Sequence, residues 1–196
     1  MLGGMRVIAG ELRSRRLETP RGMATRPTSD KLRETLFNVL GASVAGAKFV
    51  DLYAGSGAVG IEAISRGAEF VWFAEKAPPA VAAIRANLRA LKIAGGYALE
   101  DRGVARLLGS LERSARADVD VVFLDPPYEA ADEYKRTMEF LGEHAAEVLA
   151  AGAVVIAEHA RKQSLAETFG GLKRVRVLEQ GDAALSFYRR EDEGVR

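Results

Sequence analysis

The 196-residue chain contains no cysteine, which excludes disulfide bonds, thiolate metal sites and cysteine nucleophiles together. Histidine is scarce: only His144 and His159 occur, neither at a spacing typical of a catalytic pair, so we interpret both as structural. No apolar run approaches the roughly 18 residues of a membrane-spanning helix, and the start of the chain lacks the pattern of an export signal. These absences predict a globular, cytoplasmic protein without a metal site.

The charge of the chain is unevenly distributed. The net charge is only +1, but residues 1–33 carry eight basic and three acidic side chains, a net of +5, which leaves −4 for the remainder. Arginine suits bidentate contact with phosphates and stacking on bases. We therefore predict an RNA-binding amino-terminal arm, and the alternative is a solvated hairpin without a partner. The proposed RNA-binding residues are Arg6, Arg13, Arg15, Arg16 and Arg26.

Strand and helix patterns alternate after about residue 47, which predicts an α/β fold with a mostly parallel sheet between helices. The expected strands are 48–53, 70–75, 97–101, 119–124, 152–159, 173–180 and 184–190. The expected helices are 30–40, 59–66, 79–92, 104–116 and 132–149. The length fits a single domain over 1–196, with a basic hairpin or arm at 5–25, a core at 26–190 and a frayed tail at 191–196.

A glycine-rich segment follows the first strand of the alternating region. Gly55, Gly57 and Gly60 satisfy the G-x-G-x-x-G pattern between a strand and a helix, where the backbone turns tightly and approaches a nucleotide-like ligand. Glu75 ends the next strand, where a carboxylate can accept hydrogen bonds from a ribose diol. Asp51, just before the glycines, would repel a pyrophosphate but favours a cationic ligand. In combination with the Asp-Pro-Pro-Tyr motif after the fourth strand, this indicates S-adenosylmethionine as the cofactor rather than NAD.

The sequence Asp125-Pro126-Pro127-Tyr128 follows a buried apolar strand. The two prolines fix the backbone and remove two N–H donors, so the carbonyls of Asp125 and Pro126 stay available as acceptors. This combination of a carboxylate, a carbonyl and an aromatic ring can bind an exocyclic amine on a flat base. We predict Asp125, Pro126 and Tyr128 as the catalytic group, and the alternative is an ordinary proline turn.

These motifs resemble the class I methyltransferases, and in particular the bacterial ribosomal RNA small subunit methyltransferase D (RsmD) family. The resemblance extends almost from end to end and is carried by residues 5–10, 26–40, 51–67, 75, 125–128 and 185–188. It implies a Rossmann-like, seven-stranded sheet of order 3-2-1-4-5-7-6. It also implies methylation of the exocyclic N2 of a loop guanine in 16S ribosomal RNA, in the head of the small ribosomal subunit. We expect the substrate to be the small subunit or its assembly intermediate, and the protein to be a monomer.

The resemblance assigns cofactor contacts around the first strands of the sheet. The expected cofactor-binding residues are Asp51, Tyr53, Gly55, Gly57, Gly60, Glu75 and Asp101. The acceptor for the adenine amine is placed at Asp101, although Glu100 stands in the neighbouring register. The segment Glu179-Gln180-Gly181-Asp182 departs from the family, which more often has an aromatic residue before the glycine.

Other functions share some of these motifs. A DNA adenine-N6 or protein glutamine methyltransferase would also use the Asp125 motif, but the former usually adds a recognition domain and the latter usually carries Asn there. Methylation at carbon 5 of a pyrimidine usually needs a cysteine, which this chain lacks. An NAD-dependent oxidoreductase and a non-catalytic RNA-binding module are the remaining alternatives.

Overall fold

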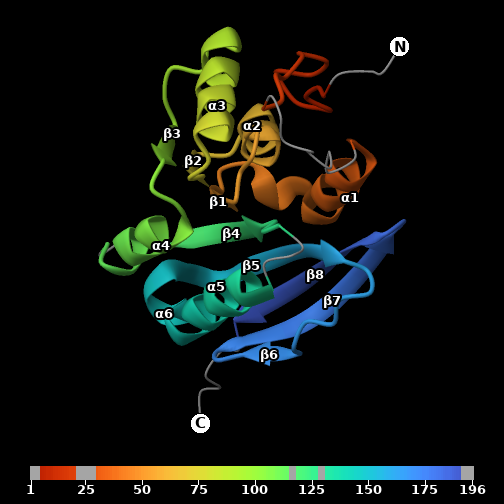
Figure 1. The fold of residues 1–196 in the computed structure, drawn as a ribbon, viewed down its shortest axis with the longest axis vertical. Helices are drawn as coiled ribbons and strands as arrows, with labels where there is room; N and C mark the ends of the chain where they lie inside the picture. Colours follow the sequence, from red (N-terminus) through yellow and green to blue (C-terminus); the bar gives the residue numbers. More distant parts are fainter. Residues whose placement is uncertain (1–4, 21–29, 115–117, 128–130, 191–196) are drawn as a thin grey trace. The chain divides into compact units, whose positions relative to one another are not determined.

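The computed structural model describes residues 5–20, 30–114, 118–127 and 131–190 (Figure 1). The chain divides into two compact units, Met1–Gly103 and Val104–Arg196. Each unit contains both helices and strands, as the alternation in the sequence predicts.

The first unit contains three parallel strands in the order β3-β2-β1. Its elements are α1 (Asp30–Leu40), the short 3-10 helix η1 (Gly41–Val44), β1 (Lys48–Leu52), α2 (Ala58–Ser65), β2 (Phe70–Ala74), α3 (Pro78–Ala90) and β3 (Tyr97–Glu100). Phe49, Val50 and Leu52 of β1 are fully buried, as expected for a strand covered on both faces. The helix α2 packs on β1 and β2.

The amino-terminal arm forms a short hairpin (Figure 1). Arg6 and Arg16 pair in antiparallel fashion, and the Val7 amide donates to the Arg15 carbonyl at 2.9 Å. The chain reverses after Gly10, which has a φ of 81°, a value that glycine adopts without strain. The expected hairpin is therefore present in the described residues 5–20.

The second unit contains five strands in the order β4-β5-β8-β7-β6. Its elements are α4 (Val104–Glu112), β4 (Val119–Leu124), α5 (Ala131–Glu143), α6 (Ala145–Val148), β5 (Leu149–Ala160), β6 (Thr168–Phe169), β7 (Leu172–Gln180) and β8 (Ala183–Arg190). The pair β4–β5 is parallel and the other pairs are antiparallel. The α5 helix packs against α6 and β6, and α6 packs against α4 and β5.

Within each unit the strand order agrees with the order implied by the resemblance, but the described residues form eight strands instead of seven. The additional strand, β6, has only two residues, too few to give an alternating sequence pattern. The expected long helix at 132–149 is wrong, because the chain breaks at His144 between α5 and α6 and β5 already begins at Leu149.

The close approach of β6 to the end of α5 explains this break. A Cβ on Gly142 would lie 1.9 Å from the Phe169 carbonyl oxygen, so only glycine fits here. The Gly142 carbonyl accepts a hydrogen bond from the Gly171 amide at 2.9 Å, and the end of the helix is thereby satisfied by a distant segment.

Candidate active site

The glycine-rich loop of the first unit is held by the buried carboxylate of Asp51. Asp51 Oδ2 accepts a hydrogen bond from the Gly60 amide at 2.8 Å, in the first turn of α2. A negative charge at a helix amino terminus satisfies an otherwise unpaired amide and interacts favourably with the helix dipole. Asp51 therefore holds the glycine loop to the start of α2, which agrees with the expectation that this carboxylate helps to order the loop.

The glycines of the loop have different roles. Gly57 has a φ of 77° and caps α2, whereas a Cβ on Gly60 would lie 2.3 Å from the Phe73 ring. Gly60 therefore allows α2 to pack closely on β2. A Cβ on Gly55 would meet no atom within 4 Å, so the loop presents an open backbone surface there. Tyr53, at the start of the loop, also has a positive φ of 60°.

Both oxygens of the Glu75 carboxylate are hydrogen-bonded to backbone amides. Oε2 accepts from Gly55 at 2.9 Å, and Oε1 accepts from Lys76 at 2.7 Å and from Ala77 at 2.9 Å. An ionised carboxylate has about four lone-pair sites, so acceptor capacity remains for a ligand hydroxyl. Glu75 thus connects the end of β2 to the glycine loop, a second role that its position after the strand does not reveal.

We expect Glu75→Ala to weaken S-adenosylmethionine binding. The substitution leaves three backbone amides without their acceptor and removes the predicted ribose contact. Hydrogen bonds to charged groups contribute about 1.5–3 kcal/mol, which corresponds to a dissociation constant raised roughly 10- to 150-fold. Calorimetric titration measures this change, with the exposed acid Glu69→Ala as the control for charge. An unchanged dissociation constant for Glu75→Ala would contradict the assignment.

The acidic residues at the end of β3 each pair with an arginine. Asp101 Oδ2 lies 2.8 Å from Arg85 Nη2, and Glu100 Oε1 lies 3.1 Å from Arg102 Nε. The strand ends at Glu100, and Asp101 begins the following turn. Asp101 is exposed, so its ion pair contributes little to stability and its second oxygen is a possible acceptor for a ligand. The assignment of the adenine contact to Asp101 stays a prediction.

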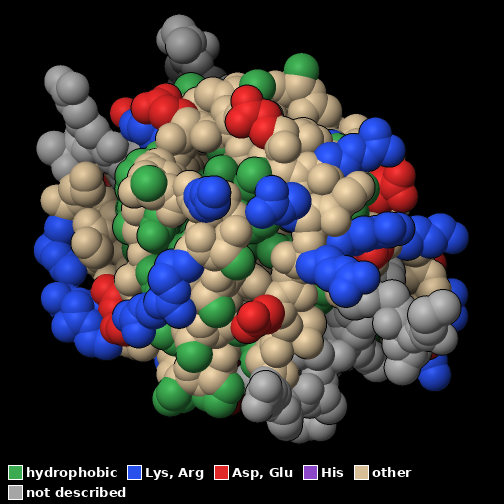
Figure 2. Space-filling view, turned by 90° about the horizontal axis from the view of Figure 1, so that it is seen from above, with side chains coloured by type: hydrophobic (Ala, Val, Ile, Leu, Met, Phe, Trp, Pro, Cys, Tyr) green, Lys and Arg blue, Asp and Glu red, His purple; other side chains and the backbone are tan. Residues whose placement is uncertain are grey.

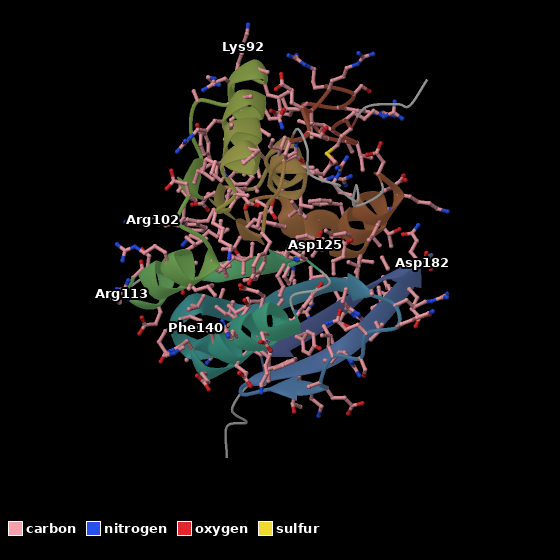
Figure 3. The ribbon with its side chains drawn as sticks, in the orientation of Figure 1. Lys92, Arg102, Arg113, Asp125, Phe140 and Asp182 are labelled. Carbon is pink, nitrogen blue, oxygen red and sulfur yellow. The ribbon has the colours of Figure 1, made fainter. Side chains whose placement is uncertain are left out.

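The Asp125 motif lies in the second unit, directly after β4 (Figure 3). The last four residues of β4 are buried, Asp125 is half-buried, Pro126 is buried and Pro127 is exposed. Tyr128 lies outside the described residues, so its predicted stacking role stays a prediction. The sequence correctly placed the carboxylate at the point where the buried strand ends.

The buried side chain of Tyr134 holds the Pro126 carbonyl in place. The Tyr134 hydroxyl lies 2.7 Å from the Glu158 carbonyl oxygen on β5 and 3.1 Å from the Pro126 carbonyl oxygen. The single hydroxyl proton is shared by the two carbonyls, with the shorter contact to Glu158. Because a carbonyl oxygen has two lone pairs, Pro126 can still accept from a ligand. Sequence reasoning missed Tyr134, whose helical spacing with Met138 indicates burial but not its polar partners.

The amino-terminal arm is fixed to α2 by the buried carboxylate of Glu62. Its oxygens accept from the Ile8 amide at 2.7 Å, the Ala9 amide at 3.0 Å and Arg66 Nε at 2.8 Å. The Ser65 hydroxyl bonds to the Ala9 carbonyl at 2.6 Å. The arm is therefore part of the packed unit, an arrangement that no local pattern in the sequence indicates.

A fully buried arginine on α1 completes this network. Arg33 bonds to Asp30 at 3.0 Å and to the Arg6 carbonyl, and its Nε lies 3.8 Å from Glu62. Burial lowers the pKa of Arg33, and the neighbouring carboxylates of Asp30 and Glu62 oppose this effect. A buried cation of this kind is retained only where carboxylates compensate its charge.

The predicted RNA-binding arginines Arg6, Arg13, Arg15 and Arg16 are all exposed on the arm. Arg6 Nε lies 4.0 Å from Asp30, whereas Arg15 Nη2 lies 3.5 Å from the Ala90 carbonyl at the end of α3. Arg26 lies outside the described residues. Their role in binding RNA stays a prediction.

His159 is bonded inside the sheet of the second unit. Its Nδ1 lies 2.9 Å from the Ala160 carbonyl and must donate, so Nε2 accepts from the Ser186 hydroxyl at 2.8 Å in the neutral ring. Burial lowers the pKa of His159 from its ordinary value of 6.5. Because the unfolded chain then binds this proton more readily, His159 stabilises the fold above pH ~6.5 and less as the pH falls.

Two further properties follow from the described part of the chain. No group of three or more His, Cys, Asp or Glu side chains there could hold a metal ion. None of its helices has the length and apolar character needed to cross a bilayer.

Comparison with known proteins places these features in a family. A family model described as conserved hypothetical protein 95 matches residues 5–189. The putative rRNA methyltransferase YlbH of Bacillus subtilis is 33% identical over 188 residues, which cover 95% of this chain and 99% of that protein. Ribosomal RNA small subunit methyltransferase D of Escherichia coli (strain K12) is 32% identical over 196 residues, covering 98% of this chain and 93% of that protein.

Solved structures agree with this relationship. The putative methyltransferase yhhF from Escherichia coli has a TM-score of 0.81 and 30% sequence identity, with 96% of this chain and 99% of that chain covered. A putative methylase from Haemophilus influenzae has a TM-score of 0.76 and 27% identity, with 97% of this chain and 100% of that chain covered.

The α/β fold, the glycine-rich loop after β1 and these similarities define a class I methyltransferase, whose cofactor is S-adenosylmethionine. The chain belongs to the ribosomal RNA small subunit methyltransferase D family, as the resemblance in its sequence implied. The open backbone at Gly55 and the remaining acceptor capacity of Glu75 fit this cofactor, and the alternative of NAD is set aside.

Proposed function

We propose that this protein methylates the exocyclic N2 of a guanine in 16S ribosomal RNA. Membership of the family supports ribosomal RNA as the substrate, since relatives with coverage of more than nine-tenths of this chain are named rRNA methyltransferases. The observation that carries the choice of an amine is the acceptor pair at the end of β4, where the buried Tyr134 hydroxyl fixes the Pro126 carbonyl. The substrate would be the small ribosomal subunit or its assembly intermediate. The protein would act on it as a monomer in the cytoplasm.

The chemistry of guanine explains why such acceptors are needed. The N2 lone pair is delocalised into the ring, so its attack on a methyl group requires that this pair be localised on nitrogen. The Asp125 carboxylate and the Pro126 carbonyl would accept the two amine protons and stabilise the positive charge that develops on nitrogen. Tyr128 would stack on the base, a contact of about 1–3 kcal/mol in comparable platforms. A loop guanine suits this site better than a paired one, because the base must leave its stack.

S-adenosylmethionine, when bound, supplies an electrophilic methyl group on a sulfonium ion. Asp51 and Glu75 keep the glycine loop in shape for the cofactor through the Gly60 and Gly55 amides. Formation of the nitrogen–carbon bond would leave the electron pair of the broken carbon–sulfur bond on sulfur, and the methylated amine would give up one proton. The Asp125 carboxylate is the group that would receive this proton before it passes to solvent.

Mass mapping of 16S ribosomal RNA tests the proposal. RNA from a strain that lacks this gene should have lost one methyl group on a guanine, and the purified protein with S-adenosylmethionine should restore it. Fragmentation of the modified nucleoside then places the methyl group on N2 or elsewhere. A methylation pattern identical to that of the parent strain would contradict the function, and recovery of the methyl group on adenine N6 would contradict the choice of base.

A further inference from the structure

The basic arm is joined to α3 by one buried amide side chain. Asn87 Oδ1 accepts from the Glu18 amide at 2.7 Å, and Asn87 Nδ2 donates to the Glu18 carbonyl and to the Ser56 carbonyl, each at 3.0 Å. A buried amide that is satisfied on both sides fixes the position of its partners. Asn87 therefore fixes the position of the arm relative to α3, and with it the exposed side chains of both.

Two cations lie at the carboxyl end of α3, next to the arm. Arg89 is in the last turn of the helix, and Lys92 follows it after Leu91. Arg15 of the arm reaches the same turn, because its Nη2 lies 3.5 Å from the Ala90 carbonyl. Figure 3 shows Lys92 pointing outward from the upper end of α3. We call Arg13, Arg15, Arg16, Arg89 and Lys92 the arm–α3 surface.

These cations differ in their partners from the ion-paired arginines of the same unit, which are Arg6, Arg33, Arg66, Arg85 and Arg102. Among the residues that the structure describes, Arg13, Arg16, Arg89 and Lys92 form no ion pair, and all are exposed. In contrast, Arg85, one turn before Arg89 on the same helix, lies 2.8 Å from Asp101. A cation without a carboxylate partner keeps its full attraction for an external anion.

The surroundings of these cations suit an extended polyanion. Ala82 and Ala90 are exposed on α3, so small side chains lie beside the arginines and a backbone of phosphates can approach closely. The acidic residues of the arm, Glu11 and Glu18, are outnumbered by the five cations. The view from above in Figure 2 shows Lys and Arg side chains gathered in several groups, with fewer acidic ones.

We propose that the arm–α3 surface binds the phosphate backbone of the ribosomal RNA substrate, so that Arg89 and Lys92 extend the footprint of the arm onto the helix. The proposal rests on the proposed function, which supplies RNA as the polyanion. Charge complementarity selects this occupant: exposed, unpaired cations on a rigid support bind phosphates and release the counterions that surround them. Arginine can in addition contact a phosphate through two parallel hydrogen bonds.

The experiment measures binding of the full chain to a fluorescent in vitro transcript of 16S ribosomal RNA at several salt concentrations. Each phosphate contact contributes a slope of about −0.7 to −0.9 in a plot of log K against log salt, so Arg89→Gln with Lys92→Gln should flatten the slope by roughly 1.4–1.8. At 0.1 M salt this corresponds to binding weakened roughly 25- to 60-fold. The triple variant Arg13→Gln, Arg15→Gln, Arg16→Gln should show a similar or larger change.

Arg85→Gln is the matched control. Arg85 lies on the same helix, but Asp101 already compensates its charge. The Arg85→Gln substitution should therefore change the salt slope little. Thermal melting and calorimetric binding of S-adenosylmethionine verify that each variant is folded.

Three outcomes would overturn the inference. If the salt slope of the Arg89→Gln, Lys92→Gln variant equalled that of the wild type, α3 would not contact the RNA. If Arg85→Gln changed the slope as much as the Arg89 and Lys92 variant does, the change would reflect the net charge of the protein and not a local binding surface. Weakened binding to whole small subunits with normal binding to the transcript would assign the surface to a protein partner. Failure of the wild-type protein to methylate ribosomal RNA would contradict the proposed function instead, which the mass mapping reports separately.

Discussion

Asp125→Ala is expected to lower the turnover of RNA methylation by about 10²–10⁴, the effect of losing a positioned polar catalytic group. The substitution removes the carboxylate that we propose as the acceptor of an amine proton but leaves the Pro126 carbonyl and its contact with Tyr134 in place. Because the glycine loop is held by other residues, the dissociation constant of S-adenosylmethionine should change little. Single-turnover transfer of a labelled methyl group to 16S ribosomal RNA measures the rate.

Two companion variants sharpen this test. Asp125→Asn keeps one acceptor oxygen without the charge, so its rate should lie between those of the wild type and Asp125→Ala. Asp132→Ala removes an exposed carboxylate in the first turn of α5 and serves as the control for charge in the same unit. Normal turnover by Asp125→Ala would remove this residue from the mechanism.

Glu62→Ala should destabilise the protein more than any surface substitution. The variant leaves the buried Arg33 without a carboxylate near its Nε and removes the ion pair of Arg66. It also removes the acceptor of the Ile8 and Ala9 amides. Removing one partner of a buried ion pair costs about 3–5 kcal/mol. For a chain of this length, that free energy corresponds to a melting temperature lower by roughly 6–20 °C.

Thermal unfolding monitored by circular dichroism measures this change, and hydrogen exchange at Ile8 and Ala9 reports whether the arm has been released. Glu69→Ala, an exposed glutamate in the same unit, provides the control and should lower the melting temperature by less than about 2 °C, as expected of most surface substitutions. An equal melting temperature for Glu62→Ala and Glu69→Ala would show that the network around Arg33 does not stabilise the fold.

Local patterns in the sequence predicted the elements that carry the site. The strands β1, β2 and β4 are short runs rich in apolar residues, and each was expected within one residue of its observed bounds. The glycine spacing correctly located the start of α2, because a positive φ and a close helix–strand approach both require glycine. Such features depend on neighbouring residues, so they can be inferred without tertiary structure.

Contacts between distant residues could not be inferred in this way. Glu62 bonds to an amide 54 residues earlier, and Asn87 to one 69 residues earlier. In the sequence Glu62 is one polar residue in a helix, and nothing nearby indicates that its side chain is buried. Tyr134 and the two-residue β6 were missed for the same reason, since their partners lie on other strands or loops.

The attachment of the arm by Glu62, Ser65 and Asn87 limits how this protein can be engineered. Transplanting residues 5–20 onto another methyltransferase would not transfer their conformation, because the acceptors of their amides belong to α2 and α3. A chimaera that is to keep the conformation of the arm must therefore contain the arm together with both helices.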